Sequence, residues 1–220
     1  WNNGLLELEY SEDLGNYTLV KEHNYESSNG NLQTISVDTS DGSYGWLRVK
    51  DVVVDGEGLV WITNSLVKKG LAFMNTNGQW KSYNITSYNT QNSHLGDLLI
   101  DNQGKKWFVI ANGGGMIVYD DNGTPENTND DNNKHLNTSA GQGNLPSNTV
   151  YSLAIDNDGE IWVGTDKGVA VFYDTDEVFG LNGDAQQVLV EADGYIEPII
   201  ANESVTAIAV DGANRKWFGT

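Results

Sequence analysis

The chain has 220 residues and a formal net charge of −19, from 31 acidic and 12 basic side chains. This length allows one sizeable domain with a buried core, and the negative charge argues against nucleic acid or an anionic membrane as the main partner. The chain has no cysteine, which excludes disulfides, thiolate metal sites and cysteine nucleophiles. Seven Trp, ten Tyr and 25 Gly favour short strands joined by tight turns, so we expect almost no helix.

One pattern occurs four times along the chain, which indicates internal repeats. It reads VVVDGEGLVW from Val52, LLIDNQGKKW from Leu98, LAIDNDGEIW from Leu153 and IAVDGANRKW from Ile208. In every copy an aspartate precedes a tryptophan by six residues. The pairs are Asp55 and Trp61, Asp101 and Trp107, Asp156 and Trp162, and Asp211 and Trp217.

A tight turn is expected between the aspartate and the tryptophan of each copy. Three residues after the aspartate stands a residue type that tolerates positive φ, namely Gly58, Gly104, Gly159 or Asn214. An aspartate at the start of such a turn can accept hydrogen bonds from the turn's backbone N–H groups. We therefore interpret the aspartates as turn formers rather than catalytic acids.

Further strands follow each turn and complete a unit. The strand before the turn carries apolar side chains on both faces, as in residues 152–155, so both faces must be covered. A third strand follows the tryptophan at residues 70–73, 116–119 and 168–173, and a more polar fourth strand is clearest at 78–83. Each unit is thus predicted to be a four-stranded antiparallel meander.

Stacking such units around an axis covers their inner strands, which predicts an all-β fold, a β-propeller of four-stranded antiparallel blades. A solenoid is the alternative, but hairpin turns at spacings of 46 to 55 residues suit blades better. In chain order we expect a partial blade at residues 1–23, whole blades at 48–84, 94–139 and 149–190, and a partial blade at 203–220. Since Trp1 and Trp217 both fall on a second strand, we expect a fragment of a larger propeller of about seven blades.

Residues 144–173, NLPSNTVYSLAIDNDGEIWVGTDKGVAVFY, resemble the two-component regulator propeller repeat. That family is abundant in Bacteroidetes, in the periplasmic sensor part of hybrid histidine kinases and in surface proteins. The W-x-G-T end of its motif recurs at residues 217–220, whereas WITN at 61–64 and WFVI at 107–110 depart from it. The resemblance implies the propeller fold without identifying a ligand.

Residues 208–220, IAVDGANRKWFGT, look most like a segment of PorZ-type proteins. These propeller proteins are attached to the outer surface by the type IX secretion apparatus, act with the sortase machinery and bind anionic lipopolysaccharide. The resemblance implies a non-enzymatic binding and scaffold protein at the periplasm or cell surface. Its partners would be polysaccharide, lipopolysaccharide, or proteins of a secretion or signalling complex. No run reaches the roughly 20 apolar residues of a membrane span.

The candidate ligand-binding residues lie on loops that meet at one mouth of a propeller, because loops carry function more often than the scaffold does. These loops join second to third strands and fourth strands to the next first strands. A sugar-binding surface needs flat aromatic faces beside amides and acids, and an anionic polysaccharide also needs lysines or bridging cations. The candidates are Tyr44, Trp46, Asn64, Lys68, His94, Asn112, Asp166 and Lys167.

Motifs for metals and catalysis are weak. The stretches DNDG at 156–159 and DDNG at 120–123 are similar to calcium loops but lack the full spacing and the distal glutamate. His23, His94 and His135 are widely separated, and no nucleophile elbow or glycine-rich phosphate loop occurs. We therefore expect no cofactor, no metal site and no catalytic residue.

Three alternatives stay open. The chain can instead belong to the ligand-sensing propeller of a hybrid two-component system that recognises an oligosaccharide. A lyase-type propeller enzyme is possible, although it would need a catalytic histidine and a metal at one mouth. A glycosidase with paired carboxylates is also open, since among 31 acids some pair will lie at a suitable distance.

Overall fold

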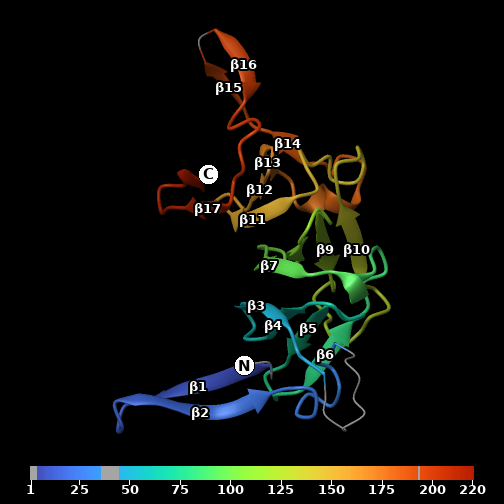
Figure 1. The fold of residues 1–220 in the computed structure, drawn as a ribbon, viewed down its shortest axis with the longest axis vertical. Coiled ribbons are helices and arrows are strands. Elements are labelled where there is room, and N and C mark those ends of the chain that lie inside the picture. Colours follow the sequence, from blue (N-terminus) through green and yellow to red (C-terminus); the bar gives the residue numbers. More distant parts are fainter. Residues whose placement is uncertain (1–3, 36–44, 193) are drawn as a thin grey trace. The chain divides into compact units, whose positions relative to one another are not determined.

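The computed structural model describes residues 4–35, 45–192 and 194–220 (Figure 1). These residues contain eighteen β-strands and two short 3-10 helices, so the expectation of almost no helix is confirmed. Their strand pairs are antiparallel throughout. The chain divides into two compact units, unit 1 with residues 1–85 and 89–93, and unit 2 with residues 86–88 and 94–220.

Unit 1 contains a two-stranded hairpin and a four-stranded meander. The hairpin pairs β1 (Leu5–Ser11) with β2 (Asn16–His23). The meander runs in the order β3 (Val49–Val54), β4 (Val60–Asn64), β5 (Leu71–Met74) and β6 (Trp80–Tyr83). A 3-10 helix, η1 (Thr90–Asn92), follows the meander.

Aromatic side chains hold unit 1 together. Trp61 and Phe73, from adjacent strands of the meander, stack with ring centroids 5.0 Å apart. His23 at the end of β2 is buried, and its Nδ1 accepts a hydrogen bond of 3.1 Å from the indole N–H of Trp80. Its Nε2 therefore carries the proton and donates to Glu7 at 2.9 Å. These bonds link the hairpin to the meander, so this histidine has a structural role.

Unit 2 contains two four-stranded meanders and two two-stranded hairpins. The first meander consists of β7 (Leu95–Ile100), β8 (Lys106–Ile110), β9 (Met116–Asp120) and β10 (Asn132–Leu136). The second consists of β11 (Val150–Ile155), β12 (Ile161–Thr165), β13 (Gly168–Phe172) and β14 (Gln186–Gln187), with η2 (Asp176–Phe179) before its last strand. The hairpins pair β15 (Leu189–Ala192) with β16 (Tyr195–Pro198), and β17 (Ala207–Val210) with β18 (Lys216–Gly219).

The sheets of unit 2 pack face to face. Trp107 of the first meander contacts Phe172 of the second, with ring centroids 5.1 Å apart. On the other face of the second meander, Trp162 contacts Phe218 of β18 at 5.9 Å. Buried clusters of aliphatic side chains fill both interfaces. The second meander is therefore covered on both faces, as its doubly apolar strands require.

The repeated aspartate organises the turn between the first two strands of each copy. Asp156 accepts hydrogen bonds through Oδ1 from the backbone N–H groups of Asp158 and Glu160, at 2.9 and 3.0 Å. Its Oδ2 accepts from the indole N–H of Trp162 at 3.1 Å. The other three copies make the corresponding bonds, with indole distances between 2.8 and 3.0 Å.

The interpretation of these aspartates as turn formers is confirmed. The residue three positions later has positive φ in every copy, from 61° at Asn214 to 87° at Gly159. The bond between the aspartate and the indole was not foreseen from the sequence. It explains the constant spacing of six residues, because that spacing brings the indole N–H back to the carboxylate across the hairpin.

Gly164 allows the second meander to approach its neighbour closely. A Cβ at this position would lie 2.4 Å from Oγ of Ser152 and 2.6 Å from the backbone oxygen of Val205. The glycine of the W-x-G-T motif is thus explained by packing. At the corresponding positions, Thr63 in unit 1 and Val109 in the first meander of unit 2 occupy buried sites.

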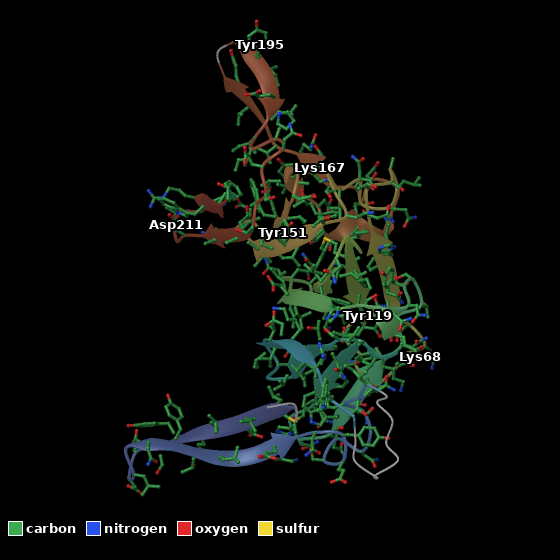
Figure 2. All side chains as sticks on the ribbon, in the orientation of Figure 1. Lys68, Tyr119, Tyr151, Lys167, Tyr195 and Asp211 are labelled. Atoms are coloured by element: carbon green, nitrogen blue, oxygen red, sulfur yellow. The ribbon has the colours of Figure 1, made fainter. Side chains whose placement is uncertain are left out.

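The structure corrects one expectation about the connections. The connections from a fourth strand to the next first strand are predicted to be loops, including residues 195–203 after the third whole blade, but Tyr195 begins strand β16 (Tyr195–Pro198) instead. The hairpin β15–β16 extends away from the remainder of unit 2, with Tyr195 near its end (Figures 1 and 2). Tyr195 and Ile196 are strongly exposed there.

Candidate functional site

In unit 1, the candidate Asn64 is the last residue of β4, and the candidate Lys68 lies on the loop between β4 and β5. Asn64 is completely buried, and its Nδ2 donates a hydrogen bond of 2.7 Å to the backbone oxygen of Gln33. Its role in this structure is to fasten the preceding connection, so the placement does not support a direct contact with a ligand. Lys68 is exposed, and its backbone oxygen accepts a hydrogen bond from Thr90 (Figure 2).

Two aromatic candidates belong to the long connection before β3. Trp46 is half exposed, and the guanidinium carbon of Arg48 lies 6.0 Å from its ring centroid. Such a geometry is a cation–π contact at the outer limit of its range, and it leaves part of the indole face open. Tyr44 lies outside the described residues. Trp46 therefore offers a flat apolar surface of the kind that a sugar ring can contact.

The other four candidates gather on one side of unit 2. The loop between β8 and β9 carries Asn112, and the preceding residue Ala111 donates to the backbone oxygen of His94 at 2.8 Å. The loop between β12 and β13 carries Asp166 and Lys167. His94, Asn112 and Lys167 are exposed.

A single connection joins these two loops. The backbone oxygen of Asn148 accepts a hydrogen bond from Gly115 at 2.8 Å, and that of Thr149 accepts one from Asp166 at 3.1 Å. Because the two acceptors are consecutive residues, both loops are fixed to the same short segment. The geometry thus brings His94, Asn112, Asp166 and Lys167 to neighbouring loops at the end of the sheets opposite the aspartate turns.

Asp166 has an unusual environment within this surface. Its Oδ1 is buried and has no hydrogen-bond partner among the described residues. A buried acceptor without a donor costs on the order of 1 to 3 kcal/mol, and more when the group is charged. A ligand hydroxyl or ammonium group could supply the missing donor. From the sequence, Asp166 is recognisable only as a polar loop residue, because the burial of one of its oxygens depends on the folded loop.

At the opposite end of unit 2, the carboxylate of Asp156 has a cation and several hydrogen-bond donors around it. Lys216 donates to Oδ2 of Asp156 at 2.8 Å, and its Nζ lies 5.0 Å from the ring centroid of Trp162. Burial would raise the pKa of Asp156, but hydrogen bonds from Lys216, the indole and the turn backbone lower it to about 2. Burial and the adjacent negative charge of Asp156 raise the pKa of Glu160.

The exposed copy of the turn behaves similarly. Hydrogen bonds from the Trp217 indole, the backbone of Arg215 and the Arg215 side chain lower the pKa of Asp211 to about 2, against the opposing effect of burial. Both stretches once compared with calcium loops have turn geometry instead, with the side chains of Asp120, Asp121 and Asp156 accepting backbone N–H groups. Among the described residues no cluster of three or more His, Asp or Glu side chains has the geometry to hold a metal ion.

In the same part of the chain, no helix has the length and apolar character needed to cross a membrane.

Comparison with known proteins assigns the repeat. Residues 144–167 match the family model of the two component regulator propeller. These residues include β11, β12 and the Asp156 turn, the region whose sequence resembles that repeat. No curated protein matches the chain in sequence.

Two groups of solved structures resemble the chain. PorZ, an essential surface component of the type IX secretion system of Porphyromonas gingivalis, matches with a TM-score of 0.73 and 25% identity over 99% of this chain and 28% of PorZ. The extracellular domain of BT3049 from B. thetaiotaomicron, described as a hybrid two component system, matches with a TM-score of 0.56 and 17% identity over 99% of this chain and 23% of that one. The chain therefore spans about a quarter of these proteins.

A virginiamycin B lyase from Staphylococcus aureus, solved with quinupristin, also matches, with a TM-score of 0.53 and 14% identity over 99% of this chain and 63% of the lyase. At this identity the likeness concerns the fold alone. Together with the antiparallel four-stranded sheets, these matches confirm the predicted fold class, a β-propeller of which the chain forms a part. The expected blade boundaries and the number of blades in the whole propeller stay predictions.

Proposed function

We propose that the chain is part of a non-enzymatic, extracytoplasmic propeller that binds and scaffolds, and that it serves type IX secretion as a PorZ-like component. The likeness to PorZ carries this proposal. It combines higher identity, 25% against 17%, with a higher TM-score, 0.73 against 0.56, than the likeness to the BT3049 domain over the same share of the chain. A cell-surface or periplasmic location follows from the same proposal.

The loops of unit 2 are the proposed ligand surface, with polysaccharide or lipopolysaccharide as the ligand. Asp166 would accept a hydrogen bond from a sugar hydroxyl through its otherwise unpartnered Oδ1. His94, Asn112 and Lys167 are exposed on the neighbouring loops and would add polar contacts. Unit 1, taken by itself, would offer a cation at Lys68 and an aromatic face at Trp46. Lysines are needed for an anionic polysaccharide because the chain as a whole carries a charge of −19.

Deletion of the whole gene in its bacterium tests the secretion role. We expect type IX cargo proteins to accumulate in the periplasm and to return to the cell surface when the gene is restored. The tagged protein should be sensitive to protease added to intact cells and should co-purify with type IX components. Normal cargo display in the deletion strain would refute the secretion role, and resistance to protease in both intact and outer-membrane-permeabilised cells would refute the location.

The second candidate function is the sensor part of a hybrid two-component system. The match of residues 144–167 to the regulator propeller family and the likeness to BT3049 favour it. In this case the complete gene would encode a membrane-spanning segment and a kinase domain after the propeller. Transcription of a polysaccharide-use operon, measured with and without oligosaccharide, would then respond to deletion of the gene, while cargo secretion would not.

A further inference from the structure

A groove of about 700 Å³ lies beside strand β10 in unit 2. Residues 132–135 of β10 and residues 179–181 line it. Ser87, Gly141 and Gln142 complete the lining. None of the candidate ligand-binding residues lines this groove, so we treat it as a separate feature.

The groove must run along the edge of β10 rather than over one of its faces. Consecutive side chains of a strand point to opposite faces of the sheet. Four consecutive residues of β10 line this groove, and Ser87 and Phe179 contribute to it from segments bonded to the two opposite faces, so the groove follows the edge of the strand. β10 is the outermost strand of its sheet and pairs only with β9, so this edge is open in the part of the chain that the structure describes.

Other segments of the unit lie against both faces of β10, so its open edge lies in a slot. On one face, Oδ1 of Asn133 accepts a hydrogen bond from the backbone N–H of Ser87 at 2.8 Å. On the other face, Nζ of Lys134 donates to the backbone oxygen of Val178 in η2 at 2.8 Å. The slot therefore lies between the segment around Ser87 and the segment that contains η2.

We propose that this slot binds an extended peptide segment of a partner protein, which pairs with the open edge of β10 as an additional strand. Edge strands present unpaired N–H and C=O groups that recruit such segments, and main-chain hydrogen bonds supply much of the affinity. Among the described residues, the backbone of residues 132–135 has no hydrogen-bond partner outside the pairing with β9. The five residues of β10 match a peptide of similar length.

The lining indicates the chemistry of the peptide. Phe179 is partly buried and Leu181 is 98% exposed, so an apolar side chain on the peptide would cover surface that now faces water. No acid lines the groove itself, and its one lysine, Lys134, is bonded to the backbone oxygen of Val178. Exposed acids lie nearby in the sequence, with Asp130 two residues before β10 and Glu177 two residues before Phe179. A basic residue flanking the apolar one would complement these acids and the overall charge of −19.

The polar sequence of β10 makes the site selective. Its residues Asn132, Asn133, Lys134 and His135 contain no apolar side chain, and such edges resist indiscriminate pairing. Binding would therefore depend on the apolar contact with Phe179 and Leu181 in addition to the backbone. This proposal goes beyond the ligand surface on the loops and does not depend on it.

The test begins with selection of random heptapeptides, displayed on phage, against the 220-residue chain, with the variant Leu181→Asp used for counter-selection. We expect the selected peptides to carry an apolar residue next to Lys or Arg. A synthetic selected peptide should slow hydrogen exchange at residues 132–136 by tenfold or more. It should bind Leu181→Asp at least tenfold more weakly, as measured by fluorescence anisotropy. The side chain of Leu181 is almost fully exposed, so this substitution should leave folding unchanged.

Two controls separate strand addition from surface adhesion. The variant Leu14→Asp alters another exposed leucine, far from the groove in sequence, and should bind the peptide as the unmodified chain does. A peptide methylated at alternate backbone nitrogens should lose at least tenfold in affinity, because it cannot donate to the edge. The proposal fails if no peptide survives counter-selection, if the methylated peptide binds equally well, or if residues 132–136 are protected by oligosaccharides and not by peptides.

Discussion

Lys216 and Asp156 join two successive sheets of unit 2 through an ion pair of 2.8 Å in which the side chain of the aspartate is fully buried. The same carboxylate also holds its own turn and accepts the indole N–H of Trp162. A charge buried in this way is stabilised only while all its donors are present, since an unpaired buried charge is costly. The pair therefore couples the local turn to the packing of the next sheet.

Acid should weaken the chain through Asp156. Its pKa falls from 3.8 in the unfolded chain to about 2 in the folded one, so its stabilising contribution is complete above pH 4 and is lost as the pH falls towards 2. The shift corresponds to about 2 kcal/mol. Urea denaturation at a series of pH values between 2 and 6 would measure this loss in the free energy of unfolding.

The variants Asp156→Asn and Lys216→Met sharpen this test. Asp156→Asn should flatten the dependence of unfolding free energy on pH between 4 and 2. Lys216→Met removes the partner and should raise the pKa of Asp156, which reduces the dependence in part. An unchanged pH profile in Asp156→Asn would contradict the assignment.

The indole bond can be isolated in the first meander of unit 2, where Asp101 accepts from Trp107 at 2.8 Å. Asn75 shows that an asparagine can hold a turn of this kind, since its Oδ1 accepts from the backbone N–H groups of Asn77 and Gln79. We therefore expect Asp101→Asn to keep the turn and lose the indole bond, at a cost of about 1 to 3 kcal/mol.

A double-mutant cycle with Trp107→Phe gives the measurement. The two single changes remove the same bond, so the double variant should be less destabilised than the sum by about 1 kcal/mol or more. The exposed Asp13→Asn serves as the control and should change the unfolding free energy by less than about 0.5 kcal/mol. Strict additivity of Asp101→Asn and Trp107→Phe would show that the bond contributes nothing.

Gly164→Ala should destabilise unit 2 by about 1 to 3 kcal/mol, because its Cβ would meet Ser152 and a backbone oxygen of the next sheet that cannot move freely. Gly56→Ala is the matched control, since a Cβ there meets nothing within 4 Å and Gly56 does not have positive φ. It should be neutral or stabilising by up to about 1 kcal/mol. Thermal unfolding of the two variants side by side would distinguish them, and equal effects would contradict the packing argument.

Asp166→Asn should separate stability from binding. Removing a negative charge whose Oδ1 is buried without a donor should leave the unfolding free energy unchanged or raise it by about 1 kcal/mol. If the loops of unit 2 bind lipopolysaccharide as proposed, this binding, measured by calorimetry, should weaken at least tenfold. Asp174→Asn, a change at another exposed acid of unit 2, should affect neither quantity. A clear loss of stability in Asp166→Asn would show that the carboxylate supports the fold instead.

Most of the fold could be predicted from the repeat, because an interpretation of the pattern has to fit all four of its copies. The aspartates, the glycines with positive φ and the doubly apolar strands could all be interpreted from local chemistry. Asn64 could not, since a polar residue in a loop is expected to be exposed. Its burial depends on Gln33, which is 31 residues away in the sequence.

Two other features could not be predicted from the sequence, for different reasons. The hairpin β15–β16 has apolar residues that nothing in its unit covers, so no buried pattern marks it. The groove beside β10 is assembled from separate segments, around Ser87, β10 and Phe179. Such a combination exists only after folding, and no stretch of sequence contains it.

In contrast, four of the candidate residues did come together on the loops of unit 2, because the order of strands alone fixes which loops share an end.

Each of the four aspartate turns is closed mainly by hydrogen bonds within its own two strands, so one end of each sheet that carries the repeat is fixed largely by local contacts. The loops at the other end of these sheets are therefore not needed to align the strands. Insertions and polar substitutions can accumulate there at little cost to folding, as the differing lengths of the loops before β5, β9 and β13 already show. A scaffold of this kind can acquire new recognition surfaces at one end while the other stays constant.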